Sequence, residues 1–87
     1  MQGKKIGIIA GIGELPKEVV QILQERKQDF VIIFLDILPD FVDALAKEQY
    51  QKIAIGQVGK IFAFLRQNEV SQILMIGRVT KPKFSEI

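Results

Sequence analysis

Four short apolar runs divide this chain of 87 residues, and they constrain its fold more than any other feature. They are rich in isoleucine and do not alternate with polar residues: Ile6–Ala10, Phe30–Leu35, Ile53–Ile55 and Ile73–Ile76. Continuous runs of this kind are typical of parallel strands that are buried on both faces of a sheet. Because parallel strands need long crossover connections, the segments between the runs should contain helices.

The three segments between these runs carry helical patterns. Apolar residues recur four positions apart within each of them, as Val19 and Leu23 do in the first. The expected helices are 15–27, 39–49 and 57–68. Strands and helices therefore alternate along the chain, and this alternation predicts an α/β fold with a four-stranded parallel sheet and right-handed crossovers.

The expected architecture is a single Rossmann-like domain over residues 1–87, with three α/β/α layers and the strand order 3-2-1-4. In that order the first two helices cover one face of the sheet, and the third covers the other face nearly alone. Phe64 lies off the main apolar stripe of the third helix. We therefore expect an apolar patch on that second face, covered by another copy of the chain or by a domain absent from this sequence.

The composition excludes several classes of function. The chain has no cysteine and no histidine, so it can form neither a disulfide framework nor a Ser-His-Asp or Cys-His catalytic site. Its net charge is only +2, and the basic residues are spread along the chain, which argues against nucleic-acid binding. The apolar runs have the length of strands, and the N-terminus lacks a leucine-rich signal core, so we expect a cytoplasmic protein.

A glycine-rich turn links the first strand to the first helix. Gly11 and Gly13 allow a sharp bend and a close approach to the main chain, and the free N–H groups at the helix start favour an anion. Asp36 closes the second strand roughly 20 residues later, where dinucleotide-binding domains place a ribose ligand. Pro16 replaces the third glycine of that fingerprint. The turn thus predicts a phosphate-bearing ligand, and a tight turn without a ligand is the alternative.

A second glycine turn, Gly56–Lys60, also follows a strand and opens a helix. Lys60 has the charge to meet a phosphate, but the spacing of a phosphate-binding loop is absent and no Ser or Thr follows to hold magnesium. In the alternative interpretation, Gly59 lets the helix approach the sheet and Lys60 is simply solvated.

The third turn is Gly77–Pro82, at the end of the fourth strand. It places Arg78 and Lys81 at the edge where a ligand would lie, although both cations could equally be solvated charges of an exposed loop. If all strands are parallel, the three turns meet at one edge of the sheet, which favours a shared binding site. Asp36 and Asp40 flank the end of the second strand and could share a metal, but a solvated loop position and an acidic residue at a helix start are the favoured interpretation.

These motifs, taken together, resemble a known family. Ile8–Pro16, Gly56–Lys60 and Gly77–Pro82 follow each other at separations similar to those in the N-terminal domain of the UDP-2,3-diacylglucosamine pyrophosphatases of the LpxI type, which act in lipid A biosynthesis. The resemblance implies that these motifs form part of a substrate cleft. The residues that it assigns to substrate binding are Gly11, Ile12, Gly13, Leu15, Gly56, Gly59, Lys60, Gly77, Val79 and Lys81.

The resemblance also implies a two-domain enzyme that hydrolyses a UDP-sugar lipid with Mg²⁺ or Mn²⁺, giving UMP and the acylated sugar 1-phosphate. The catalytic, metal-linked aspartate belongs to the C-terminal domain, so we expect neither catalytic nor metal-binding residues in this chain, which is inactive alone. Contact with the inner membrane is at most peripheral. Two alternatives remain open: a nucleotide-binding or NAD-binding module without chemistry, and a minimal structural domain that self-associates.

Overall fold

The computed structural model of the protein describes residues 4–78. Its strands are β1 (Ile6–Ala10), β2 (Phe30–Leu35), β3 (Tyr50–Ile53) and β4 (Gln72–Ile76). Its α-helices are α1 (Leu15–Glu25) and α2 (Val58–Gln67), and two short 3₁₀ helices, η1 (Asp40–Ala44) and η2 (Lys47–Gln49), precede β3. No helix in this described part of the chain has the length and apolar character needed to cross a membrane.

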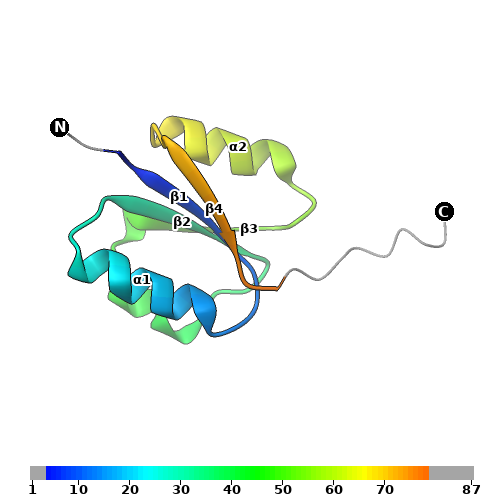
Figure 1. The fold of residues 1–87 in the computed structure, drawn as a ribbon. Coiled ribbons are helices and arrows are strands. Elements are labelled where there is room, and N and C mark those ends of the chain that lie inside the picture. The colour runs from blue at the N-terminus through cyan, green and yellow to red at the C-terminus, as the bar shows by residue number, and fades with distance from the viewer. Residues whose placement is uncertain (1–3, 79–87) are drawn as a thin grey trace.

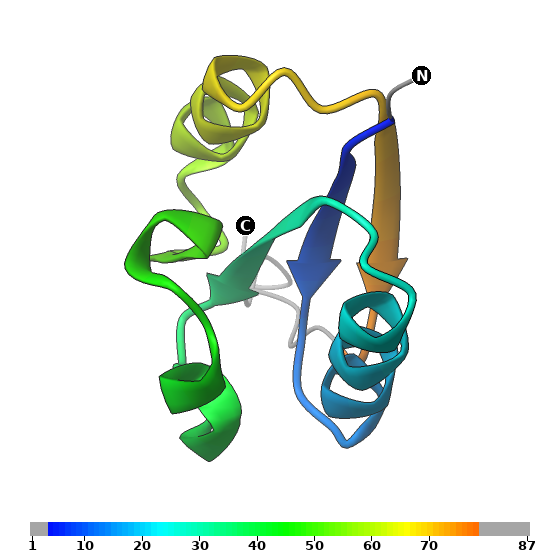
Figure 2. The ribbon, with the colours of Figure 1, turned by 90° about the vertical axis from the view of Figure 1, so that its left-hand side faces the viewer.

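The four strands form one parallel sheet in the order β3-β2-β1-β4, as predicted. In the central pair, Ile8 of β1 lies opposite Ile32 of β2, while β4 pairs only with β1 and forms one edge of the sheet. Helices α1 and α2 lie on opposite faces of the sheet (Figures 1 and 2). The chain is therefore an α/β sandwich of three layers, in which all strands point the same way.

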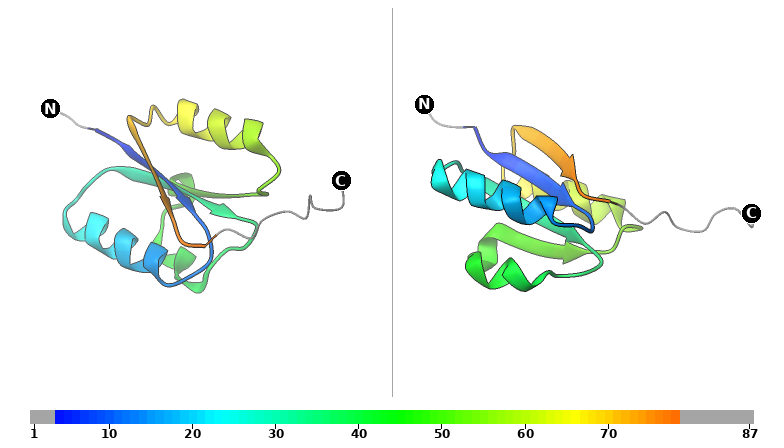
Figure 3. Two further views of the ribbon diagram at one scale, coloured as in Figure 1. Left: turned by 45° about the vertical axis from the view of Figure 1, so that its right-hand side comes forward. Right: turned by 60° about the horizontal axis from the view of Figure 1, so that its bottom comes forward.

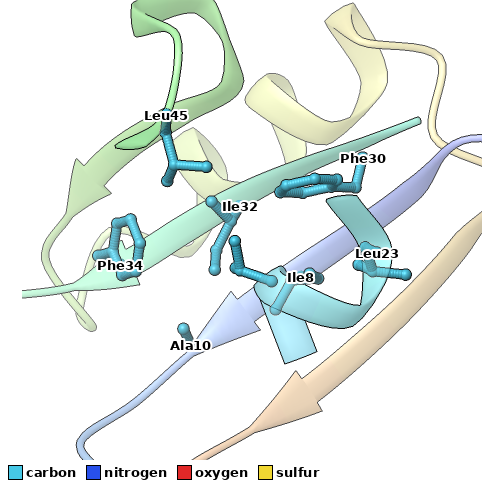
Figure 4. Close-up of a cluster of buried hydrophobic side chains, with 8 residues drawn as sticks. Ile8, Ala10, Leu23, Phe30, Ile32, Phe34 and Leu45 are labelled. Atoms are coloured by element: carbon cyan, nitrogen blue, oxygen red, sulfur yellow. The ribbon is translucent and has the colours of Figure 1, made fainter. Parts of the chain in front are cut away.

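Each face of the sheet carries its own hydrophobic core. On the α1 side, Ile8, Ile32 and Phe34 pack with Val20 and Leu23 of the helix (Figure 4). On the other side, a smaller cluster joins the sheet to α2. Its residues are Val31, Ile33, Leu35, Ile53, Ile61 and Leu65. All six residues of β2 are buried, which confirms that its unbroken apolar run reflects burial on both faces.

The predicted helix at 39–49 is wrong. Residues 40–44 and 47–49 form 3₁₀ turns, and the intervening Leu45 has an extended backbone. The side-chain Oε1 of Gln49 accepts a hydrogen bond of 3.1 Å from Ala46 N–H, so a local side chain takes a donor that an α-helix would use. The extended backbone still delivers Leu45 to the α1-side core, and the Phe41 ring packs edge-on against Phe34 with 5.7 Å between centroids.

The third strand begins and ends earlier than predicted, at Tyr50–Ile53 in place of 53–55. Two side chains explain why it ends there. The N–H of Ala54 donates to Gln57 Oε1 at 3.1 Å, and the N–H of Ile55 donates to Asp36 Oδ1 at 3.3 Å. Both N–H groups therefore bond to side chains and not to the backbone of a neighbouring strand. Because β3 is an edge strand with exposed polar residues in its middle, its apolar run does not mark its limits.

The face of the sheet on the α2 side is incompletely covered over β4. Ile73 and Met75 point to that face, in register with Gly7 and Ile9 of β1, and Met75 is 70% exposed. Figure 2 shows β4 at the margin of the sheet that is farther from α2, and the right-hand view of Figure 3 shows β4 next to β1. The expected apolar patch is therefore present in the described structure. Phe64 is not part of it, however, because that ring packs partly buried against the α2-side core.

An exposed apolar edge strand should promote association between copies of the chain. We expect sedimentation velocity of the 87-residue chain to show concentration-dependent self-association, and Met75→Lys to reduce it by placing a charge on the surface that associates. The same substitution should change the free energy of unfolding by no more than about 0.5 kcal/mol, because Met75 is largely exposed.

Leu38→Lys is the matched control, since it adds the same charge at an exposed loop residue distant from β4 in sequence and outside the sheet. Equal effects of the two lysines on association would contradict a role for β4. A wild-type chain that stays monomeric at all concentrations would contradict self-association altogether.

Candidate functional site

The carboxyl ends of the parallel strands meet at one rim of the sheet, which is the usual position of ligand sites in open α/β sheets. The turns that follow β1, β2, β3 and β4 begin there at Gly11, Asp36, Ala54 and Gly77. Figure 1 shows that the strand arrows all end on the side from which these turns leave. The first two glycine turns, and the third as far as Arg78, therefore leave the sheet at one edge, as predicted.

The first and third glycine turns are bonded directly to each other. Ile12 and Arg78 form an isolated antiparallel bridge, with N···O distances of 2.6 Å and 2.8 Å, and Gly11 N–H donates to Ile76 O at 2.8 Å. A Cβ on Gly11 would overlap the Arg78 carbonyl group, and Gly77 has a φ of +86°. Glycine is therefore required at both positions by the crossing of two backbones, whether or not a ligand binds.

The start of α1 retains donors that an anion could use. Within residues 4–78, the N–H groups of Gly13, Glu14 and Leu15 donate no hydrogen bond, whereas those of Gly11 and Ile12 are taken by β4 and the turn that follows it. Pro16 lies in the first turn of the helix and has no N–H. A ligand at this turn would meet residues 13–15, together with the partial positive charge of the helix start.

A cavity of about 210 Å³ lies between the ends of β1, β2 and β3, at the rim. Its charged residues are Asp36 and Arg78, and Gly11 and Ile12 form part of its wall. Three apolar residues complete it: Leu35, Ile37 and Ile55. The cavity thus combines one anionic and one cationic side chain from strand ends that are far apart in sequence.

An apolar cavity of about 160 Å³ lies beside this one and shares Gly11, Ile12, Leu35 and Ile37 with it. Aromatic and proline residues make up most of the remaining wall: Pro16, Phe34, Pro39 and Phe41. A third, more polar hollow of about 230 Å³ includes Glu14, Lys17 and Asp40. Sequence reasoning missed Ile37, Phe41 and Lys17, because these residues belong to no motif and reach the rim only through the fold.

The second glycine turn does not line any of these three cavities. Gly56, Gly59 and Lys60 are exposed, and a Cβ on either glycine would meet no atom within 4 Å. Close approach of α2 to the sheet is therefore not the reason for Gly59. Only Ile55, just before this turn, contributes to the cavity that holds Asp36 and Arg78.

The other residues that the resemblance assigned to substrate binding are placed as follows. Ile12 and Gly13 line the rim cavities, and Leu15 is exposed at the start of α1. Gly77 sets the turn into Arg78. Val79 and Lys81 lie outside the described residues.

Carboxylate side chains do not gather in one place at the rim in the described part of the chain. Among residues 4–78, no three Asp or Glu side chains come close enough to share a metal ion, and the chain has no His or Cys. Asp36 lines the cavity with Arg78, whereas Asp40 lines the separate polar hollow. The two aspartates therefore line different hollows of the rim.

Comparison with known proteins identifies the family of the chain. A family model, described as the LpxI N-terminal domain, matches residues 5–87. The UDP-2,3-diacylglucosamine pyrophosphatase LpxI of Caulobacter vibrioides is 31% identical over 84 residues, which cover 97% of this chain and 29% of that protein. The chain thus spans less than a third of the length of this relative. The match over nearly its whole length shows that the chain belongs to the LpxI N-terminal domain family.

Proposed function

We propose that this chain is the substrate-positioning, N-terminal part of a UDP-2,3-diacylglucosamine pyrophosphatase. The observation that carries the proposal is the family match over residues 5–87. The described structure supports it, because the cavity with Asp36 and Arg78 lies at the rim where open parallel sheets bind nucleotides. The products of the whole reaction would be UMP and 2,3-diacylglucosamine 1-phosphate.

The share of this chain in the reaction is binding and orientation. Arg78 supplies a cation for the diphosphate, and the N–H groups of residues 13–15, which donate no hydrogen bond within residues 4–78, add donors at the start of α1. The apolar cavity beside them offers cover for an uncharged part of the ligand. When the diphosphate is held in a fixed position, the attack of a water molecule on it has a lower entropic cost. The attacking water and the Mg²⁺ or Mn²⁺ that the resemblance implies would be supplied by a C-terminal domain.

The acyl chains of a UDP-linked lipid hold such a substrate at a membrane surface, so we place the activity in the cytoplasm with peripheral membrane contact. The exposed surface of β4 is then a contact surface, against a C-terminal domain or another copy of the chain.

Calorimetry and an assay for UMP release test this proposal on the 87-residue chain. We expect the chain to bind UDP, with NMR shifts at residues 11–15, 36–37 and 78, and to release no UMP from the UDP-lipid above the rate in buffer. Turnover near the typical enzymatic rate of about 10 s⁻¹ would contradict a purely positioning role. Binding of NAD in place of UDP would favour the nucleotide-binding module without chemistry.

A further inference from the structure

Asp36 has an unusual backbone at the end of β2. Its φ is +72°, in the left-handed region that residues other than Gly, Asn and Asp rarely adopt. Two hydrogen bonds hold it there: Asp36 N–H donates to Ile53 O at 3.1 Å, and Asp36 Oδ1 accepts from Ile55 N–H at 3.3 Å. The turn after β2 therefore fixes both the main chain and the carboxylate of this residue against the end of β3.

The carboxylate retains hydrogen-bonding capacity on its other side. Within residues 4–78, the bond from Ile55 is the one hydrogen bond that the Asp36 side chain makes, so Oδ2 accepts none. Asp36 is exposed and lines the cavity of about 210 Å³. An ionised carboxylate only accepts hydrogen bonds, so its partner in this cavity must be a donor such as a hydroxyl group.

The two charged residues of the cavity have opposite chemical preferences. Asp36 repels a phosphate and attracts hydroxyl donors, whereas Arg78 attracts a phosphate and has no acceptor. Gly11 and Ile12 line the same cavity. A ligand that carries both a vicinal diol and a phosphate matches both charged residues, and a ribonucleotide is such a ligand.

We propose that Asp36 recognises the ribose of the bound nucleotide by accepting hydrogen bonds from its 2′- and 3′-hydroxyl groups. An acidic residue at the end of the second strand is the general position for this contact in nucleotide-binding α/β domains. The proposal rests on the proposed function, since it assigns one contact within the same nucleotide site. Asp36 is then a specificity-determining residue that separates ribonucleotides from 2′-deoxyribonucleotides.

Calorimetry with UDP and 2′-deoxyuridine 5′-diphosphate, on the 87-residue chain and on Asp36→Asn, tests the proposal. Asparagine tolerates the left-handed backbone, and its Oδ1 can still accept from Ile55 N–H. Its amide group, however, replaces the free acceptor by a donor. We expect the wild-type chain to bind UDP about tenfold more tightly than the deoxynucleotide, which corresponds to one good hydrogen bond to a charged group. Asp36→Asn should reduce this preference, because it weakens UDP binding more than binding of the deoxynucleotide, which keeps only its 3′-hydroxyl for the contact.

Asp43→Asn is the matched control, because Asp43 is an exposed residue of η1 that lines none of the three cavities. It should leave both affinities unchanged. Equal binding of the two nucleotides by the wild-type chain would overturn the ribose contact and leave the proposed function intact. Equal weakening of both nucleotides by Asp36→Asn would also overturn it, since the effect would then not depend on the 2′-hydroxyl. Binding of neither nucleotide by the wild-type chain would overturn both proposals.

Discussion

Gly11→Ala should destabilise the protein by at least about 2 kcal/mol, although it adds a single methyl group. The added Cβ would overlap the carbonyl group of Arg78, which is backbone and cannot turn aside as a flexible side chain would. The turn after β1 must then move away from the turn after β4. That movement breaks the Ile12–Arg78 bridge and the bond from Gly11 N–H to Ile76 O.

Urea denaturation followed by circular dichroism measures this effect, and Gly59→Ala is its control. Gly59 lies within α2, and a Cβ there meets no atom within 4 Å. Alanine should therefore stabilise the helix by roughly 0.5–1 kcal/mol through its better helix propensity. The same substitution of alanine for glycine should thus lower the free energy of unfolding at Gly11 and raise it at Gly59. A Gly11→Ala variant as stable as the wild-type chain would show that the two turns are not held together.

Ile32→Ala should cost about 2–5 kcal/mol, the range for removing a fully buried aliphatic side chain. Ile32 has no exposed surface and lies at the centre of β2, opposite Ile8 and close to Phe30 and Leu45 in the α1-side core (Figure 4). The cavity would open between the sheet and α1, where the surrounding strands cannot collapse. A domain of this size has roughly 4–13 kcal/mol of stability, so this single change removes a large part of it.

The comparison for this prediction is Ile22→Ala in α1. Ile22 is 49% exposed, so truncation removes little buried surface, and alanine is the better helix former. Its unfolding free energy should stay within about 0.5 kcal/mol of the wild-type value. A similar loss for both variants in urea denaturation would mean that the α1-side core does not have the packing described above.

The fold could be predicted wherever burial alone decides the local structure. The limits of β1 and β2 agree with their apolar runs, because both strands lie in the middle of the sheet. The segment at 39–49 could not be predicted in this way. Its apolar spacing fits a helix, but Gln49 takes the Ala46 N–H and the chain turns extended at Leu45. Such competition between a side chain and the backbone for a hydrogen bond depends on local geometry, which cannot be read from the spacing of apolar residues.

The candidate site shows the same division. The sequence indicated the rim through its glycines and through Asp36, because strand ends in a parallel sheet meet at one edge. It did not indicate that Gly11 is needed for the bridge to Arg78, nor that Gly56 and Gly59 have open space around them. A glycine next to a strand signals a turn, but the neighbour that requires it is set by the fold.

Residues from the turns after all four strands, between positions 11 and 78, line the cavity with Asp36 and Arg78. No unfolded chain brings these groups together, so a ligand there binds the native state alone. Saturation then raises the melting temperature: at a free concentration one hundred times Kd, the native state gains about 2.7 kcal/mol. In a domain this small, a ligand bound in this one cavity would therefore strongly increase the fraction of the protein that stays folded as the temperature rises.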